Sequence, residues 1–128
     1  MRTQYTPKII LSTDRHDVEQ GVNSANFIQF LEVLEKVGVP YLRTRGSYDG
    51  YEERGFILED NKRNREIAFG AMEFYNQDCI LIMDNEGTGT LHFQEGGLKK
   101  IGKLKVLTEK PQGDYTKVLD SSEYFTFE

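Results

Sequence analysis

Two stretches of the chain place their apolar residues at the spacing of an amphipathic helix. In the first, the apolar face consists of Phe27, Phe30, Leu31, Leu34 and Val37. Residues that recur every three or four positions bury one side of a helix. Asn23 or Ser24 is suited to cap its start, and Gly38 is suited to end it. The pattern predicts a helix over about residues 23–37.

The second helical stretch follows Asp60 or Asn61, either of which can cap a helix with its side-chain oxygen. Its apolar face consists of Ile67, Ala71, Phe74 and Tyr75. This spacing predicts a second helix that packs through that face.

Short apolar or alternating runs between and after these helices are typical of strands. They lie at about residues 9–13, 39–44, 56–58, 78–84, 90–94 and 99–107. The run 78–84 is the most continuously apolar, which predicts a central strand buried on both faces. The segment 45–55 carries three glycines and two tyrosines among charged residues, and this composition indicates a loop.

The order strand, helix, strand, strand, helix, strand is that of the ferredoxin-like fold. We therefore expect an α+β sandwich (βαββαβ) with both helices on one face of an antiparallel sheet and an added C-terminal hairpin. We expect one domain over 1–128, with a core at about 8–107 and a C-terminal tail at 108–128. The chain is too short to supply a third layer, so we expect self-association to cover the open face of the sheet.

The charge balance narrows the classes of partner. The chain has 128 residues, and its 16 Lys and Arg against 21 Asp and Glu give a formal net charge of −5. Phosphate neutralisation needs concentrated positive charge, so this balance argues against a nucleic-acid partner. It is compatible with a cationic small molecule.

The cysteine count and the search for targeting segments bear on disulfides, metal sites and cellular location. Cys79 is the single cysteine, which excludes an intrachain disulfide, and no His or Cys spacing indicates a metal site. No window approaches the ~18 apolar residues of a membrane span, and the N-terminus lacks an apolar targeting segment. We expect a cytoplasmic protein with no cofactor, no metal and no membrane partner.

The most informative candidate site lies at the end of the glycine-rich segment, where Glu52 and Glu53 are adjacent. Neighbouring side chains of extended backbone point in opposite directions, so at most one carboxylate enters a given pocket. A carboxylate beside apolar walls can act as a base or pair with an ammonium or sulfonium group. Tyr48 and Tyr51 offer a hydroxyl and a flat face for an adenine or a cation. The alternative interpretation is a solvated connecting loop.

Three segments together resemble a known family. They are Glu52–Leu58, the helix residues Ile67, Ala68 and Ala71, and Gln77–Leu81. In their order and spacing, over about residues 9–96, they resemble the small phage enzymes that degrade S-adenosylmethionine (SAM), called SAM hydrolases or SAM lyases. Ser12 and Arg15, at the polar end of the first strand, fit the same pattern.

The resemblance implies a PII-like homotrimer, related to ferredoxin-like folds, with SAM bound between subunits. It places the key acidic residue at Glu53, with Glu52 as the alternative. The substrate-binding positions that it implies are Tyr48, Tyr51, Arg15 and the main chain around Met83 and Asp84.

The resemblance also implies a reaction. In a lyase, the carboxylate of SAM displaces the sulfonium from the γ-carbon, giving 5′-methylthioadenosine and homoserine lactone, while Glu53 anchors the ammonium. In a hydrolase, Glu53 is the base for a water and the product is homoserine. Either reaction would deplete SAM, which suits a phage anti-restriction role in the host cytoplasm. The non-enzymatic alternatives are a PII-like protein that binds a nucleotide without turnover and a phage inhibitor protein.

Overall fold

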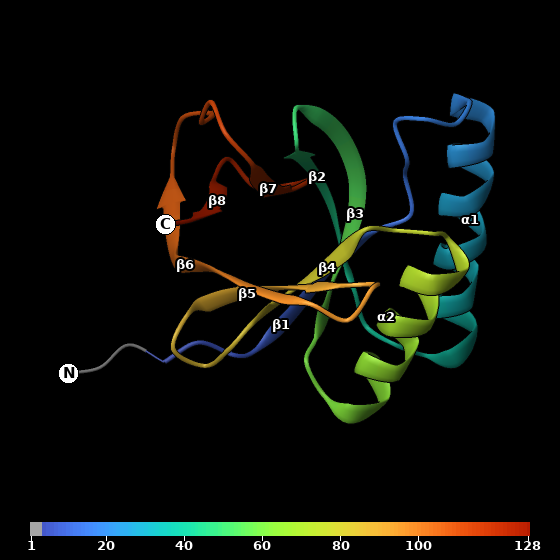
Figure 1. Ribbon diagram of the computed structural model, residues 1–128, viewed down its shortest axis with the longest axis horizontal. Coiled ribbons are helices and arrows are strands. Elements are labelled where there is room, and N and C mark those ends of the chain that lie inside the picture. The colour runs from blue at the N-terminus through green and yellow to red at the C-terminus, as the bar shows by residue number, and fades with distance from the viewer. Residues whose placement is uncertain (1–3) are drawn as a thin grey trace.

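The computed structural model describes residues 4–128, which form two helices and eight strands (Figure 1). In chain order these are β1 (Lys8–Ser12), α1 (Gln20–Val37), β2 (Leu42–Tyr48), β3 (Tyr51–Glu59), α2 (Lys62–Phe74), β4 (Cys79–Met83), β5 (Thr88–Phe93), β6 (Leu98–Leu107), β7 (Tyr115–Val118) and β8 (Tyr124–Phe127). None of the helices in this part of the chain is long and apolar enough to cross a membrane.

The strands form one closed antiparallel barrel in the order β1-β3-β2-β7-β8-β6-β5-β4, with β4 paired back onto β1. The first six elements follow the predicted order, but the expected ferredoxin-like α+β sandwich is wrong. The reason is that β5 to β8 do not add a hairpin to an open sheet. They continue the sheet from β4 around to β2, where β7 pairs with β2 over residues 44–47.

The segment 108–128, expected to be a tail, supplies two strands of this barrel. β8 pairs with β6, and the main chains of Lys103 and Glu128 exchange two hydrogen bonds of 2.9 and 3.0 Å. Gly102 allows this approach, because its φ of +113° is unfavourable for other residues and a Cβ there would lie 2.0 Å from the carbonyl carbon of Glu128. The barrel is therefore closed by residues far apart in sequence.

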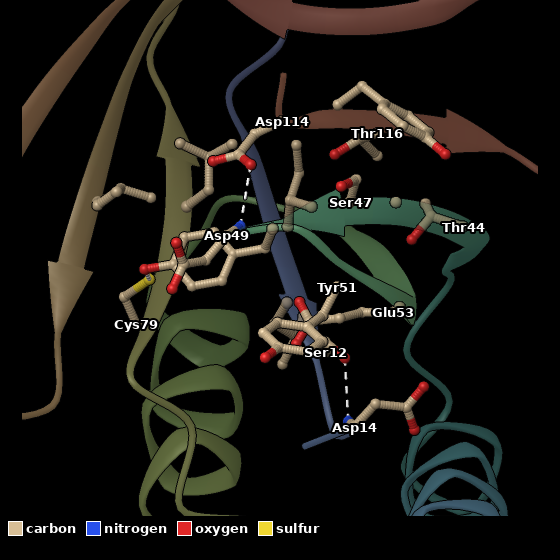
Figure 2. Close-up of a pocket in the computed structure, with 18 of the residues that line it drawn as sticks. Ser12, Asp14, Thr44, Ser47, Asp49, Tyr51, Glu53, Cys79, Asp114 and Thr116 are labelled. Carbon is tan, nitrogen blue, oxygen red and sulfur yellow. Dashed lines mark hydrogen bonds between the residues drawn. The ribbon is translucent and has the colours of Figure 1, made fainter. Parts of the chain in front are cut away.

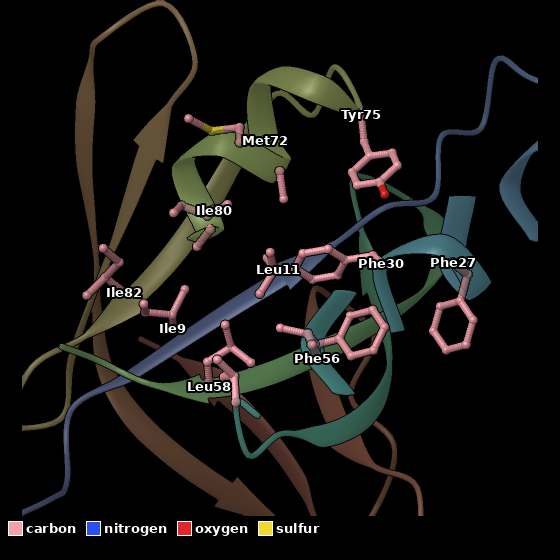
Figure 3. Close-up of a cluster of buried hydrophobic side chains, with 14 residues drawn as sticks. Ile9, Leu11, Phe27, Phe30, Phe56, Leu58, Met72, Tyr75, Ile80 and Ile82 are labelled. Atoms are coloured by element: carbon pink, nitrogen blue, oxygen red, sulfur yellow. The ribbon is translucent and has the colours of Figure 1, made fainter. Parts of the chain in front are cut away.

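The hydrophobic core lies outside the barrel, between the helices and the outer face of β1, β3 and β4 (Figures 1 and 3). At its centre Phe56 is fully buried, and the ring of Phe27 stacks on it with the centroids 5.0 Å apart. The rings of Phe30 and Tyr41 contact Phe56 edge-on. Side chains of β3 alternate between its two faces: Phe56 and Leu58 pack against the helices, whereas Glu53 and Gly55 face into the barrel.

Helix α1 ends at Gly38 as expected and buries Phe27, Phe30 and Leu34 of the predicted apolar face, but Val37 of that face is 40% exposed. The helix begins at Gln20 instead of about residue 23. Neither Asn23 nor Ser24 caps it. Asn23 is buried inside the first turns, and its amide pairs with the main chain of Arg15 in both directions, at 2.9 and 2.7 Å. The helix start therefore holds the segment that follows β1.

Helix α2 begins as predicted, but Phe74 of its predicted packing face is 71% exposed. Its N-cap is Asn61, whose side-chain oxygen accepts a 2.8 Å hydrogen bond from the main-chain nitrogen of Asn64. Such a bond satisfies one of the amide groups that have no partner within the first turn of a helix.

The predicted loop over 45–55 is wrong. β2 and β3 run through it as a hairpin that is paired from Leu42 with Ile57 to Tyr48 with Tyr51. Asp49 and Gly50 form its two-residue turn, with φ values of +51° and +85°. Positive φ at both central positions suits the right-handed twist of paired strands, and Asp-Gly is a common sequence for such a turn.

Candidate active site

The barrel encloses a cavity of about 460 Å³. Small-molecule sites typically span ~300–1,000 Å³. Three levels of side chains follow one another along its wall, and the register of the strands defines them. Consecutive levels are two residues apart along each strand, which corresponds to about 6–7 Å.

The first level is acidic. Glu53 of β3 lies in register with Gly46 of β2, which has no side chain to cover it. Asp14 after β1, Asp78 before β4 and Asp114 before β7 line the same end of the cavity, where Asp78 and Asp114 are exposed to solvent. We call these four carboxylates, Asp14, Glu53, Asp78 and Asp114, the acidic mouth.

The middle level carries small polar groups. Ser12, Gly55 and Thr44 lie in register across β1, β3 and β2. Cys79 of β4 lines the cavity near them, and its thiol donates a hydrogen bond to the Tyr48 hydroxyl, with 3.6 Å between Sγ and Oη. Within residues 4–128 the Thr44 hydroxyl has no hydrogen-bond partner. Figure 2 shows Thr44, Ser47 and Thr116 along the neighbouring strands of this wall.

The deep level is apolar. Ile10, Leu81 and Leu91 lie in register across β1, β4 and β5. Ile101 of β6 and Phe127 of β8 complete this part of the lining. We call these five residues the apolar floor.

Glu53 is the most perturbed carboxyl of the cavity. Its pKa is raised from 4.5 to about 7, first by burial and then by the negative charges of Asp14, Asp78 and Asp114, in that order. Loss of water disfavours the charged form of a carboxyl, and nearby like charges act in the same direction. The free site therefore holds a carboxylate that a bound cation would stabilise.

Asp14 and Arg54 fix the backbone beside Glu53. Asp14 is 7% exposed and accepts hydrogen bonds from Nε and a terminal nitrogen of Arg54, both at 3.1 Å. It also accepts a 2.9 Å bond from the Arg54 main-chain nitrogen, which belongs to the Glu53–Arg54 peptide. The guanidinium in turn lies 4.9 Å from the centroid of the Phe27 ring. The ion pair thus ties the site to the hydrophobic core.

The segment after β1 is held from two sides. Asn23 pairs with the main chain of Arg15, and the buried Gln77 donates a 3.0 Å hydrogen bond to the carbonyl of Asp14. These two amides hold Asp14 and Arg15 at the acidic mouth. Gln77 also lines the cavity, whereas Asn23 does not.

Glu52 and Glu53 lie on opposite faces of β3. Glu53 lines the cavity, whereas Glu52 is exposed and pairs with Arg45 at 3.0 Å. Of the two carboxylates only Glu53 lines the barrel cavity, but both line a second cavity at the rim, so the expectation that at most one enters a given pocket holds for the barrel cavity alone.

The two tyrosines lie at different depths. Tyr48 is half-buried in the cavity, and burial raises the pKa of its hydroxyl. Tyr51 is 48% exposed at the rim, where its ring stacks on His16 with the centroids 4.0 Å apart and an angle of 10° between the planes. This pair also lines a second cavity, of about 410 Å³, between the rim and the start of α1.

Arg15 lines both cavities, and its guanidinium binds Asp17 at 2.7 Å and the carbonyl of Asn76. Met83 and Asp84 lie elsewhere. They follow Leu81 at the opposite end of β4, where Met83 is buried in register with Lys8, and Asp84 accepts hydrogen bonds from the turn before β5. The structure does not bring these two residues to the cavity.

Sequence reasoning missed Asp78, Asp114 and Thr44 as parts of the site. Asp78 was visible as the polar residue before a buried strand, the position from which a side chain reaches the end of a barrel. Asp114 had no such signal, because its place depends on the pairing of β7 with β2. Its side chain accepts a 3.0 Å hydrogen bond from the main-chain nitrogen of Asp49, which joins the C-terminal segment to the β2–β3 turn.

No group of three or more His, Cys, Asp or Glu side chains within residues 4–128 is arranged to hold a metal ion.

A barrel with an acidic, partly apolar cavity of this size is a small-molecule-binding protein suited to a cationic ligand. The model of the S-adenosylmethionine lyase family matches residues 9–128, so the chain belongs to that family and is a SAM-degrading enzyme. This confirms the expected family and the expectation of an enzyme. A comparison with curated proteins found no match.

Replacing Glu53 by Gln should stabilise the protein at high pH. The pKa of Glu53 is about 7 in the folded protein, above the ordinary value of 4.5 that applies to the unfolded chain. The wild type therefore loses stability as the pH rises from 4.5 through 7. A pKa change of this size corresponds to up to about 3 kcal/mol. We expect Glu53→Gln to unfold at higher denaturant concentration than wild type at pH 8, by about 1–3 kcal/mol, with a smaller difference at pH 5.

The matched control is Glu52→Gln, whose exposed carboxylate should change the free energy of unfolding by less than about 1 kcal/mol at either pH. An equal effect of Glu53→Gln at pH 5 and pH 8 would contradict the burial of its charge.

Proposed function

We propose that the enzyme converts SAM to 5′-methylthioadenosine and homoserine lactone by intramolecular displacement. The observation that carries this proposal is the acidic mouth around Glu53. It matches a substrate with two positive centres, the sulfonium and the α-ammonium. Membership of the SAM lyase family supports the substrate and the class of reaction.

The reaction needs no group from the protein to form or break a covalent bond. A carboxylate oxygen of SAM forms a bond to the γ-carbon, the bond from that carbon to sulfur breaks, and its electron pair stays on sulfur as a thioether. The positive charge remains on the ammonium of the lactone, so no proton is lost. Holding the methionine arm in the reactive conformation can lower the barrier by about 7–11 kcal/mol.

We assign the anchoring of the substrate ammonium to Glu53. A cation next to this carboxylate favours its charged form, so binding lowers the raised pKa of Glu53 and relieves the repulsion within the acidic mouth. Tyr48 and Tyr51 would contact the substrate from the cavity wall and the rim. Arg15 can turn from its exposed partner Asp17 toward the substrate carboxylate.

One observation favours a hydrolase as a second candidate. A pKa of about 7 suits a general base at neutral pH. Glu53 would then take a proton from a water that attacks the γ-carbon, and the products would be 5′-methylthioadenosine, homoserine and a proton.

Glu53→Gln should lower kcat/KM for SAM by about 100-fold at pH 8, because a buried charge partner of the substrate is lost. In the wild type kcat/KM should rise from pH 6 to pH 8 as Glu53 ionises, whereas in the variant it should be flat over this range. Methylthioadenosine formation measures both. Glu52→Gln is the control and should keep the wild-type rate and profile. A Glu53→Gln enzyme with wild-type turnover would refute the assignment.

Turnover in ¹⁸O-labelled water separates the two reactions. A lactone formed first is later opened by water at its acyl carbon, so the label enters the carboxyl group of homoserine. Direct hydrolysis puts the label in the γ-hydroxyl group. We expect early lactone and carboxyl labelling by mass spectrometry, and label in the hydroxyl would establish the hydrolase.

A homotrimer with sites between subunits stays a prediction from the resemblance. The uncovered sheet face that first suggested it does not exist, since β5 to β8 cover that face. A different feature supports assembly: Val22, Val33 and Val37 are 40–47% exposed along one flank of α1. Light scattering of the purified chain should give three copies, and an active monomer would show that the cavity of one chain suffices.

We further propose that the reaction serves to deplete SAM in a cell. Restriction and methylation enzymes that need SAM would then be starved of it, which suits a phage anti-restriction role in the host cytoplasm. A fall in host DNA methylation on expression of the wild type, absent for Glu53→Gln, would be the sign of this role.

A further inference from the structure

We propose that SAM enters the barrel nucleoside-first, so that adenine occupies the apolar floor, the ribose lies at the middle level and the cationic arm stays at the acidic mouth. This inference rests on the proposed function and adds the orientation of the substrate to it. It leaves Met83 and Asp84, which lie beyond the floor, without a role in substrate binding.

The first argument is the order of chemistry along the wall. From the solvent inwards, β3 and β1 present Glu53, then Gly55 beside Ser12, then Ile10. SAM has the same order from its methionine arm to its base: two cationic centres, two ribose hydroxyls and a flat aromatic ring. The reverse orientation would bury the ammonium and carboxylate among Leu81, Leu91 and Phe127, where no charged partner lines the cavity, at a large cost in desolvation.

The second argument is an unused hydroxyl at the middle level. Thr44 is 4% exposed, and within residues 4–128 its hydroxyl makes no hydrogen bond. Its oxygen is not itself buried, so it can bond to a molecule in the cavity that Thr44 lines. Gly55, opposite Thr44 on β3, lets the Thr44 hydroxyl approach the β3 backbone closely, because a Cβ there would lie 2.8 Å from this hydroxyl and 2.6 Å from the carbonyl oxygen of Leu11. A ribose hydroxyl at this level would provide the missing partner.

The third argument is the volume of the cavity. A cavity of about 460 Å³ is of the size that holds one ligand of this class, and the floor alone contributes aliphatic and aromatic side chains from five strands. Aromatic bases gain most from such contacts. The exposed Tyr51–His16 pair at the rim is another surface on which adenine could stack. The test must therefore exclude an orientation with adenine at the rim.

The test uses binding of 5′-methylthioadenosine, which has the nucleoside but neither the sulfonium nor the ammonium. Ile101→Phe fills the apolar floor and should weaken methylthioadenosine binding at least tenfold by calorimetry. Ile28→Phe makes the same change on the 52% exposed outer side of α1 and should bind like the wild type. Glu53→Gln should keep methylthioadenosine affinity within twofold while its KM for SAM rises.

A second variant tests the orientation of the substrate without a bulky substitution. Thr44→Val keeps the shape and removes only the hydroxyl, and it should weaken methylthioadenosine binding by about 2–10-fold. Thr90→Val is its control, on β5 and outside the cavity lining.

Three results would overturn the orientation: wild-type methylthioadenosine affinity in both Ile101→Phe and Thr44→Val, equal losses of methylthioadenosine and SAM binding in Glu53→Gln, or no binding of methylthioadenosine by the wild type. Each can occur while the wild type still degrades SAM, so such a failure is distinct from failure of the proposed function. The latter would appear as intact SAM after incubation with the wild type.

Discussion

The three strands β1, β3 and β4 have two faces, and both must be covered for the fold to be stable. The helices cover the outer face, where Phe27 and Phe30 of α1 pack on Phe56 of β3, and β5 to β8 cover the inner face by closing the barrel. Because successive residues of a strand alternate between the faces, each core residue is followed by one that faces the cavity. The packing that stabilises the fold therefore also sets the geometry of the site.

The position of Glu53 follows from this alternation. Its neighbour along the strand, Arg54, bonds to Asp14 and contacts the ring of Phe27, while Glu53 itself is left in the cavity among three other acidic side chains. This arrangement destabilises the free protein and favours a cationic ligand, a common relation between stability and function at binding sites. In a lyase the same charge distribution would bind the substrate while the protein takes no covalent part.

Local pattern predicted the parts of the structure that depend on local sequence. The spacing of Phe27 and Leu34 and the cap at Asn61 place the two helices. The adjacent glutamates were singled out as a candidate site, but they were expected at the end of a loop and lie within β3. The Asp49–Gly50 turn could also have been predicted from its sequence, but the glycines around it suggested a loop. The closure of the barrel could not be predicted from local sequence, because it depends on pairings such as that of Gly46 with Thr116, 70 residues apart along the chain. Asp114 and the floor of the cavity follow from that closure.

The most direct test of this account is an NMR titration of the Glu53 side-chain carboxyl in the free protein, assigned with Glu53→Gln. We predict an apparent pKa of about 7, with a decrease when an unreactive cationic analogue of SAM is added. A Glu53 that titrates near 4.5 in the free protein, unchanged by the analogue, would contradict a half-buried carboxylate that favours a bound cation.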